Sequence, residues 1–153
     1  FSNNDNWKAH YKTTGPEIWR DTYGKITHFV SAMGTTGTIM GTSTYLKEQN
    51  KNIQIIGAQP TDNSKIPGIR KWSPKFLPKI FNPKKVDTVI EVSEIEARKM
   101  TKRLAKEESI FAGMSSGGSV AAALKIVKKI DSGVIVAIIC DRGDRYLSSD
   151  LFE

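Results

Sequence analysis

The stretch that decides the fold is residues 26–38, ITHFVSAMGTTGT. Residues 26–32 predict a buried strand, and residues 39–49 predict a helix. Between them lies a loop of glycine and threonine, Gly34-Thr35-Thr36-Gly37-Thr38. Glycines let a backbone approach a ligand closely, and the amides at a helix N-terminus favour an anion. The loop therefore predicts a phosphate cradle, and the alternative is a glycine-rich turn with ordinary threonine caps.

The rest of the chain alternates strands with helices. Residues 53–58, 86–92 and 134–140 predict strands, the last of them buried and apolar on both faces. Further helices are expected over residues 14–24, 93–107 and 120–130, and residues 1–14 are expected to be irregular. The pattern predicts one α/β domain over residues 1–153, with an open, mostly parallel sheet covered by helices. Loops 34–38, 113–118 and 140–146 should then converge on one rim of that sheet.

Composition limits the classes of protein that fit. The 153 residues hold 23 Lys and Arg against 16 Asp and Glu, a net charge of +7, and 39% of them are hydrophobic. These are globular values, and no apolar run reaches the ~18 residues of a membrane-spanning helix. One cysteine excludes an intrachain disulfide and a multi-cysteine zinc site, and no metal is expected. The low cysteine content also predicts a reducing compartment, and therefore the cytoplasm. The N-terminus has no signal-peptide pattern and resembles a chain entered midway.

The positive charge is concentrated in one segment. Residues 63–86 contain seven basic residues, no acidic ones and four of the six prolines. The prolines exclude a regular helix or a central strand, so a long ordered loop is expected. Arg70 and Trp72 in this loop could attract an anionic ligand, and the alternative is a solvated loop with chance lysines. Nucleic-acid binding is not favoured, because no recognition motif accompanies the charge.

Two further polar segments could carry chemistry. Ser115 could bond a heteroatom of a bound ring, although a serine there could equally cap the following helix. Cys140 and Asp141 follow the last strand at the expected ligand rim. The cysteine could instead be a small packed side chain, and the acids and arginines of this segment could pair with one another. His10 and His28 are expected to be structural.

Taken in order, these loops resemble the pyridoxal-phosphate-dependent cysteine synthase family of the tryptophan-synthase-β class. The likeness covers nearly the whole chain and includes the opening segment Thr13–Trp19, TTGPEIW. GTTGT at residues 34–38, PGIRKW at 67–72 and CDRGDRYLS at 140–148 are similar to the B-type members. The resemblance implies the larger, C-terminal domain of that fold.

The resemblance also implies roles. Gly34 to Thr38 would hold the phosphate of pyridoxal 5′-phosphate, and Ser115 would bond its pyridine nitrogen. Substrate would meet two groups of residues: Gly68, Arg70 and Trp72 at the mouth of the site, and Cys140 and Asp141 near the ring edge. The substrates would be O-acetylserine with sulfide or thiosulfate, giving L-cysteine or S-sulfocysteine. A homodimer is implied, with neither a nucleic-acid nor a membrane partner.

One departure from the family limits what these residues can do. The family is about twice as long, and its earlier half supplies the lysine that forms the Schiff base with the cofactor. No lysine of this chain falls in a matching motif, so we assign no catalytic residue and expect these residues alone to be inactive. The alternatives are a non-catalytic phosphate-binding module, such as a decayed paralogue, and a generic nucleotide-phosphate binder.

Overall fold

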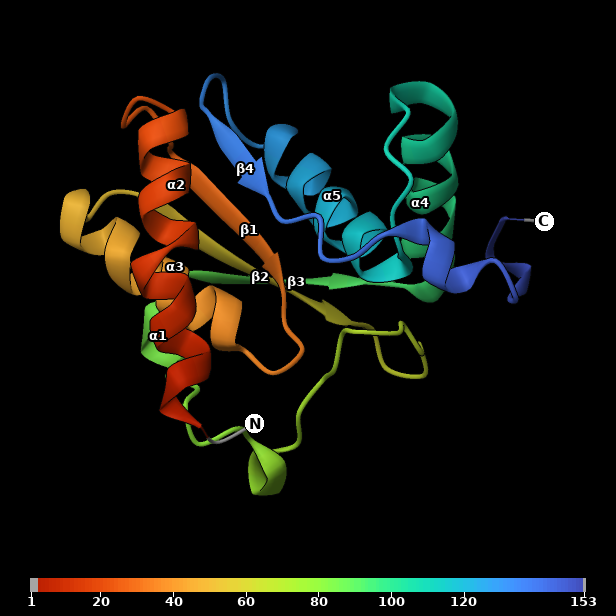
Figure 1. Cartoon of the computed structure of the whole chain (residues 1–153), viewed down its shortest axis with the longest axis horizontal. Helices are drawn as coiled ribbons and strands as arrows, with labels where there is room; N and C mark the ends of the chain where they lie inside the picture. Colours follow the sequence, from red (N-terminus) through yellow and green to blue (C-terminus); the bar gives the residue numbers. More distant parts are fainter. Residues whose placement is uncertain (1–2, 153) are drawn as a thin grey trace.

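A four-stranded parallel sheet forms the centre of the computed structural model, which describes residues 3–152 (Figure 1). The strands lie in the order β3-β2-β1-β4 and span β1 His28–Ala32, β2 Gln54–Pro60, β3 Thr88–Val92 and β4 Ile135–Ala137. In the register, His28 of β1 pairs with Gln54 of β2 on one side and with Ile135 of β4 on the other. The prediction of an open parallel α/β sheet is confirmed.

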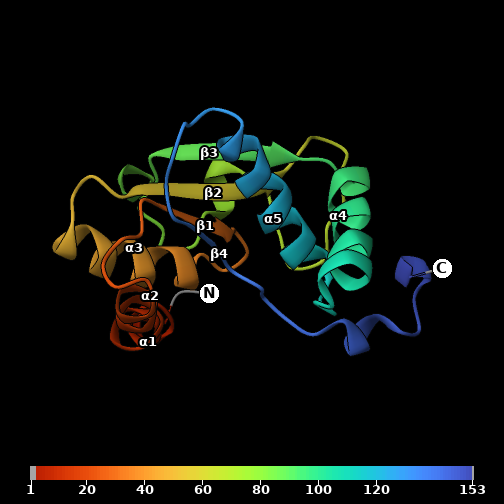
Figure 2. The same ribbon diagram turned by 90° about the horizontal axis from the view of Figure 1, so that it is seen from above.

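Helices cover both faces of the sheet (Figures 1 and 2). One layer comprises α1 Asn4–Lys12, α2 Thr14–Asp21 and α3 Gly37–Gln49, and the other comprises α4 Glu94–Glu108 and α5 Met114–Val127. Successive strand side chains point to opposite faces. Phe29 and Ile55 therefore belong to one core cluster, and Val30 and Ile56 belong to the other.

The connection from β2 to β3 is the long loop expected from its prolines. Over residues 61–87 it contains two short 3₁₀ turns, η1 Pro74–Phe76 and η2 Pro83–Lys85. Ile66 and Ile69 are buried in the core and anchor its first half. Lys71 adds a second anchor, because its Nζ lies 2.8 Å from a carboxylate oxygen of Asp62 and 2.6 Å from one of Glu91.

The first helix contradicts the expectation for residues 1–14. Residues 4–12 form α1, although residues 1 and 2 of the segment lie outside the described residues. The Asn3 side chain caps this helix by accepting from the amide of Asp5, whose charge suits the first turn. α1 buries no residue completely, so its weak apolar pattern gave little signal.

The predicted loop 113–118 is also wrong, because α5 already begins at Met114. Small residues allow this early start to pack closely: a Cβ on Gly117 would lie 2.2 Å from the Thr101 hydroxyl of α4. The buried face of α5 accordingly consists mostly of small side chains such as Ala122, with Met114 and Ile126 as its large members. Leu124 and Val127 are 39% and 48% exposed, so hydrophobicity alone would choose the wrong face.

The last strand differs from the prediction as well. β4 has three residues instead of seven, lies at the edge of the sheet and is half-buried. After it the chain runs through two 3₁₀ turns, η3 Gly143–Tyr146 and η4 Asp150–Phe152. No helix within residues 3–152 has the length and apolar character needed to cross a bilayer.

Candidate functional site

The phosphate cradle lies between β1 and α3, at the carboxyl end of a central strand. Thr36 has a left-handed backbone with φ of +71°, a conformation that β-branched residues rarely adopt. The residue is 3% exposed, and its hydroxyl oxygen is buried without a hydrogen-bond partner. Strain and an unpartnered buried hydroxyl in one residue indicate a place shaped for a ligand.

The start of α3 supplies donors for an anion. The first amides of an α-helix have no partner within the helix, and the helix dipole places positive potential there. Thr36 makes no side-chain cap to these amides. Thr35 Oγ1 accepts from the amide of Gly37 at 3.4 Å, a long contact. One threonine cap is therefore present at the start of α3, but it is long, and the Thr36 hydroxyl takes no part in it.

Part of the basic loop lies directly against the cradle. The indole N–H of Trp72 donates to the carbonyl of Gly34 at 2.7 Å, and the amide of Arg70 donates to the carbonyl of Met33 at 2.9 Å. The Arg70 guanidinium lies 5.5 Å from the centre of the Trp72 ring, within range of a cation–π contact. Gly68 has a left-handed backbone with φ of +87°. It approaches Gly34 so closely that a Cβ on Gly34 would lie 2.5 Å from the Gly68 carbonyl oxygen.

Gly68 also touches the second predicted segment, at the start of α5. A Cβ on Gly68 would lie 3.2 Å from the hydroxyl oxygen of Ser115. Ser116 accepts from the amide of Cys140, and Ser119 accepts from the amide of Ala32. These two serines thus hold the backbone, whereas the Ser115 hydroxyl faces the loop. The Ser115 side chain does not cap α5.

Cys140 and Asp141 lie beside the start of α5. Cys140 is exposed at the surface, yet partial desolvation of its thiol by the surrounding protein, reinforced by the Asp141 charge, raises the pKa of Cys140 above its usual value. The Tyr146 hydroxyl donates to Asp141 Oδ2 at 2.5 Å, while Asp141 Oδ1 is buried without a partner. Desolvation first, and this hydrogen bond second, raise the pKa of Tyr146 to about 12. The alternative of acid–arginine pairing within this segment holds for Arg142 and Asp144, whose side chains lie 2.8 Å apart.

The predicted residues thus meet at one edge of the sheet. Gly68 bridges the cradle to Ser115, and the serines of α5 bridge to Cys140. Sequence reasoning missed the contribution of α1, which brings Asn6 and His10 to the cradle. Burial lowers the pKa of His10, whose ring lies between the hydroxyls of Thr14 and Thr38. The spacing of four residues between Asn6 and His10 could have indicated that they face the same site. That inference is possible only if the segment is already known to be helical.

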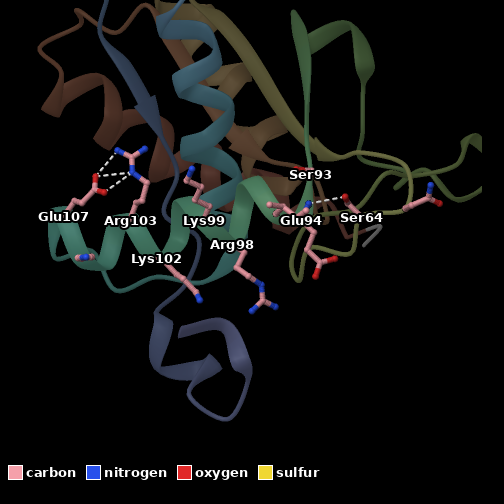
Figure 3. A pocket seen from close by; sticks show the side chains of 11 residues that line it. Ser64, Ser93, Glu94, Arg98, Lys99, Lys102, Arg103 and Glu107 are labelled. Atoms are coloured by element: carbon pink, nitrogen blue, oxygen red, sulfur yellow. Dashed lines mark hydrogen bonds and ion pairs between the residues drawn. The ribbon is translucent and has the colours of Figure 1, made fainter. Parts of the chain in front are cut away.

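A groove of about 700 Å³ lies on the outer face of α4 (Figure 3). Its basic side chains project from one side of the helix, and Arg103 pairs with Glu107. At one end of the groove the amide of Glu94 donates to the hydroxyl of Ser64. The described residues that line it include no member of the cradle, so the groove is separate from the candidate site.

Comparison with known proteins fits this geometry. Residues 1–141 match the family described as "Pyridoxal-phosphate dependent enzyme". The chain belongs to this family. It is 58% identical over 153 residues to cysteine synthase B of Pseudomonas aeruginosa, covering all of this chain and 51% of that protein. It is 55% identical over 152 residues to cysteine synthase B of Escherichia coli, covering 99% of this chain and 50% of that protein.

Solved structures agree with the sequence relatives. A crystal structure of cysteine synthase from Entamoeba histolytica superposes with a TM-score of 0.91 at 37% identity, covering 99% of this chain and 47% of that one. The chain thus spans about half the length of the relatives it matches. Its fold is that of cysteine synthases, and the family depends on pyridoxal phosphate.

The cradle fits the phosphate of that cofactor on its own structural grounds. The buried Thr36 hydroxyl lacks a partner, and the helix start offers further donors. Within residues 3–152, His, Cys, Asp and Glu side chains form no group of three that could hold a metal ion.

Proposed function

We propose that this chain forms the phosphate-binding part of a pyridoxal-phosphate-dependent cysteine synthase. The reaction is the β-replacement of O-acetylserine by sulfide or thiosulfate, which yields L-cysteine or S-sulfocysteine. The observation that carries the proposal is the buried, unpartnered hydroxyl of Thr36 on a strained backbone at the start of α3. The likeness to cysteine synthase B over the whole chain supplies the choice of reaction.

Each proposed site residue has a separate role. Gly34, Thr35, Thr36, Gly37 and Thr38 bind the phosphate through amides and hydroxyls. Pyridoxal phosphate, when bound, supplies the electron sink for chemistry at the amino-acid carbons. Ser115 orients the ring through its pyridine nitrogen. Its neutral hydroxyl, unlike a carboxylate, does not require that nitrogen to be protonated.

The basic loop and the last segment face the substrates. Arg70 and Trp72 lie at the mouth, where positive charge raises the local concentration of an anionic sulfur donor. Gly68 lets the loop pass between the cradle and Ser115 without a side chain in the way. Cys140 and Asp141 border the ring edge. The raised pKa of Cys140 keeps its thiol protonated at neutral pH, so it acts as a weak donor and not as a nucleophile.

The proposal includes limits on this chain. No lysine lies in a motif matching the cofactor-binding lysine of the family, so these 153 residues alone bind the cofactor without turning over substrate. The complete enzyme is a cytoplasmic homodimer that acts on small molecules and has neither nucleic acid nor membrane as a partner. Size-exclusion chromatography of the complete gene product tests the dimer.

The function is tested by adding pyridoxal phosphate, O-acetylserine and sulfide, and measuring cysteine. The chain alone should make none. Co-expression with the portion of the P. aeruginosa relative that it does not match should restore cysteine formation. Cysteine made by the chain alone would refute the inactivity expected of it. Cofactor binding without restored activity would favour a non-catalytic module, and tight nucleotide binding with no response to the cofactor would favour a nucleotide binder.

A further inference from the structure

Helix α1 presents two polar side chains to the cradle from outside it. Asn6 and His10 are four residues apart and therefore lie on the same face of the helix. Asn6 Nδ2 donates to Thr35 Oγ1 at 3.2 Å, and the ring of His10 lies 3.3 Å from Thr38 Oγ1. α1 therefore contacts the hydroxyls of Thr35 and Thr38, the first and last threonines of residues 34–38.

Asn6 packs against the first residue of α3. A Cβ on Gly37 would lie 2.0 Å from Asn6 Oδ1, closer than any real contact. The backbone of Gly37 is an ordinary helical one, so space explains this glycine and left-handed strain does not. The close approach fixes the position of the Asn6 amide group against the turn.

The contacts of Asn6 determine the direction of a hydroxyl proton. A threonine hydroxyl has two acceptor positions and one donor. Thr35 Oγ1 accepts from Asn6 Nδ2 at 3.2 Å and from the amide of Gly37 at 3.4 Å. With both acceptor positions taken, the Thr35 proton must be donated to a further group, and a phosphate oxygen accepts such a proton well.

We infer that Asn6 is a positioning residue of the cradle, which holds the Thr35 hydroxyl as a donor toward the phosphate of the cofactor. This inference rests on the proposed function. A neutral amide suits this position, because a carboxylate at the same place would accept the Thr35 proton and would repel the phosphate. Asn6 contacts the phosphate only through Thr35.

The test compares two ligands that differ by the phosphate alone. Pyridoxine 5′-phosphate and pyridoxine lack the aldehyde, so neither reacts with the lysines of the chain. Isothermal titration of the unchanged chain should show tighter binding of the phosphate form. Asn6→Ala should weaken binding of that form about fivefold, the usual worth of one hydrogen bond, and Asn6→Asp should weaken it further. Binding of pyridoxine should change in neither variant.

A matched control variant separates a positioning role of Asn6 from general damage to the fold. Asn4→Ala removes an asparagine of the same helix whose side chain accepts from the indole of Trp7 and not from the cradle, and it should leave both affinities unchanged. Asn6→Asp keeps the shape of the side chain and serves if Asn6→Ala unfolds. Equal weakening of both ligands, or unchanged phosphate selectivity in the Asn6 variants, would overturn the inference alone. Failure of the unchanged chain to prefer the phosphate form would overturn the cofactor assignment as well.

Discussion

Replacing Thr36 by glycine should stabilise the ligand-free chain and at the same time weaken cofactor binding. Thr36 has φ of +71° and a buried hydroxyl without a partner. Glycine adopts positive φ freely and removes the buried hydroxyl. Both features are costs to the folded state that only a bound anion would offset.

The size of the effect follows from four contributions. A left-handed backbone at a residue with a Cβ costs about 1–2 kcal/mol, and an unpaired buried hydroxyl costs about 1–3 kcal/mol. Against this, glycine costs about 0.5–1 kcal/mol of chain entropy, and the lost methyl group costs about 0.8 kcal/mol. The free energy of unfolding should therefore rise by about 2 kcal/mol at the middle of these ranges, and Tm should rise by about 2–4 °C for each kcal/mol in a chain of this size.

The assay is urea unfolding without ligand, followed by titration with pyridoxine 5′-phosphate. Thr38→Gly is the matched control for the unfolding measurement alone, because Thr38 lies in the first turn of α3 on an ordinary helical backbone, where glycine should destabilise by up to about 1 kcal/mol. Thr36→Gly should bind the phosphate ligand about tenfold more weakly, since it lacks a hydroxyl bonded to a charged group. A less stable Thr36→Gly, or one that retains full affinity, would refute the claim that strain here serves a ligand.

Three further substitutions test the surroundings of the site. Gly113→Ala should destabilise by about 1–3 kcal/mol in urea unfolding, because its Cβ would lie 2.4 Å from atoms of Asp141 and Tyr146; unchanged stability would contradict this packing. Burial lowers the pKa of His10 below 6.5, so the stability that neutral His10 contributes is complete above pH 6.5 and is lost as the pH falls. His10→Gln should therefore flatten the acidic part of the curve of unfolding free energy against pH. The pKa of Tyr146 is raised from 10.0 to about 12, so the stability that the protonated Tyr146 contributes is complete below pH 10 and is lost between pH 10 and 12. Tyr146→Phe should be less stable at pH 8 and should not lose this stability at alkaline pH.

Much of the fold could be predicted because local signals and packing agree in the centre of the chain. The capping box of Ser93 and Glu96 fixes the start of α4, and both of its hydrogen bonds are present. The strand, loop and helix of residues 26–49 follow from apolar residues interrupted by glycine and threonine. The cradle could be proposed from sequence because a strand–turn–helix leaves few other places for an anion.

The errors lie where tertiary packing outweighs local pattern. α1 lacks a buried residue, so no periodicity marks it. α5 begins among serines and glycines, which have low helix propensity but permit close contact with α4. β4 resembles a central strand because it is apolar on both faces, yet it lies at an edge of the sheet. The role proposed for Asn6 depends on the packing of α1 against the start of α3, so it could not be predicted before α1 was known.

The central claim is that residues 34–38 hold the phosphate of a vitamin B6 cofactor. A crystal structure of the chain grown with pyridoxal 5′-phosphate tests it most directly. We expect the phosphate at the start of α3, bonded to the amides and threonine hydroxyls of residues 34–38, with the ring nitrogen facing Ser115. A phosphate held by the lysines of residues 63–86, with the Thr36 hydroxyl still unpartnered, would contradict the claim.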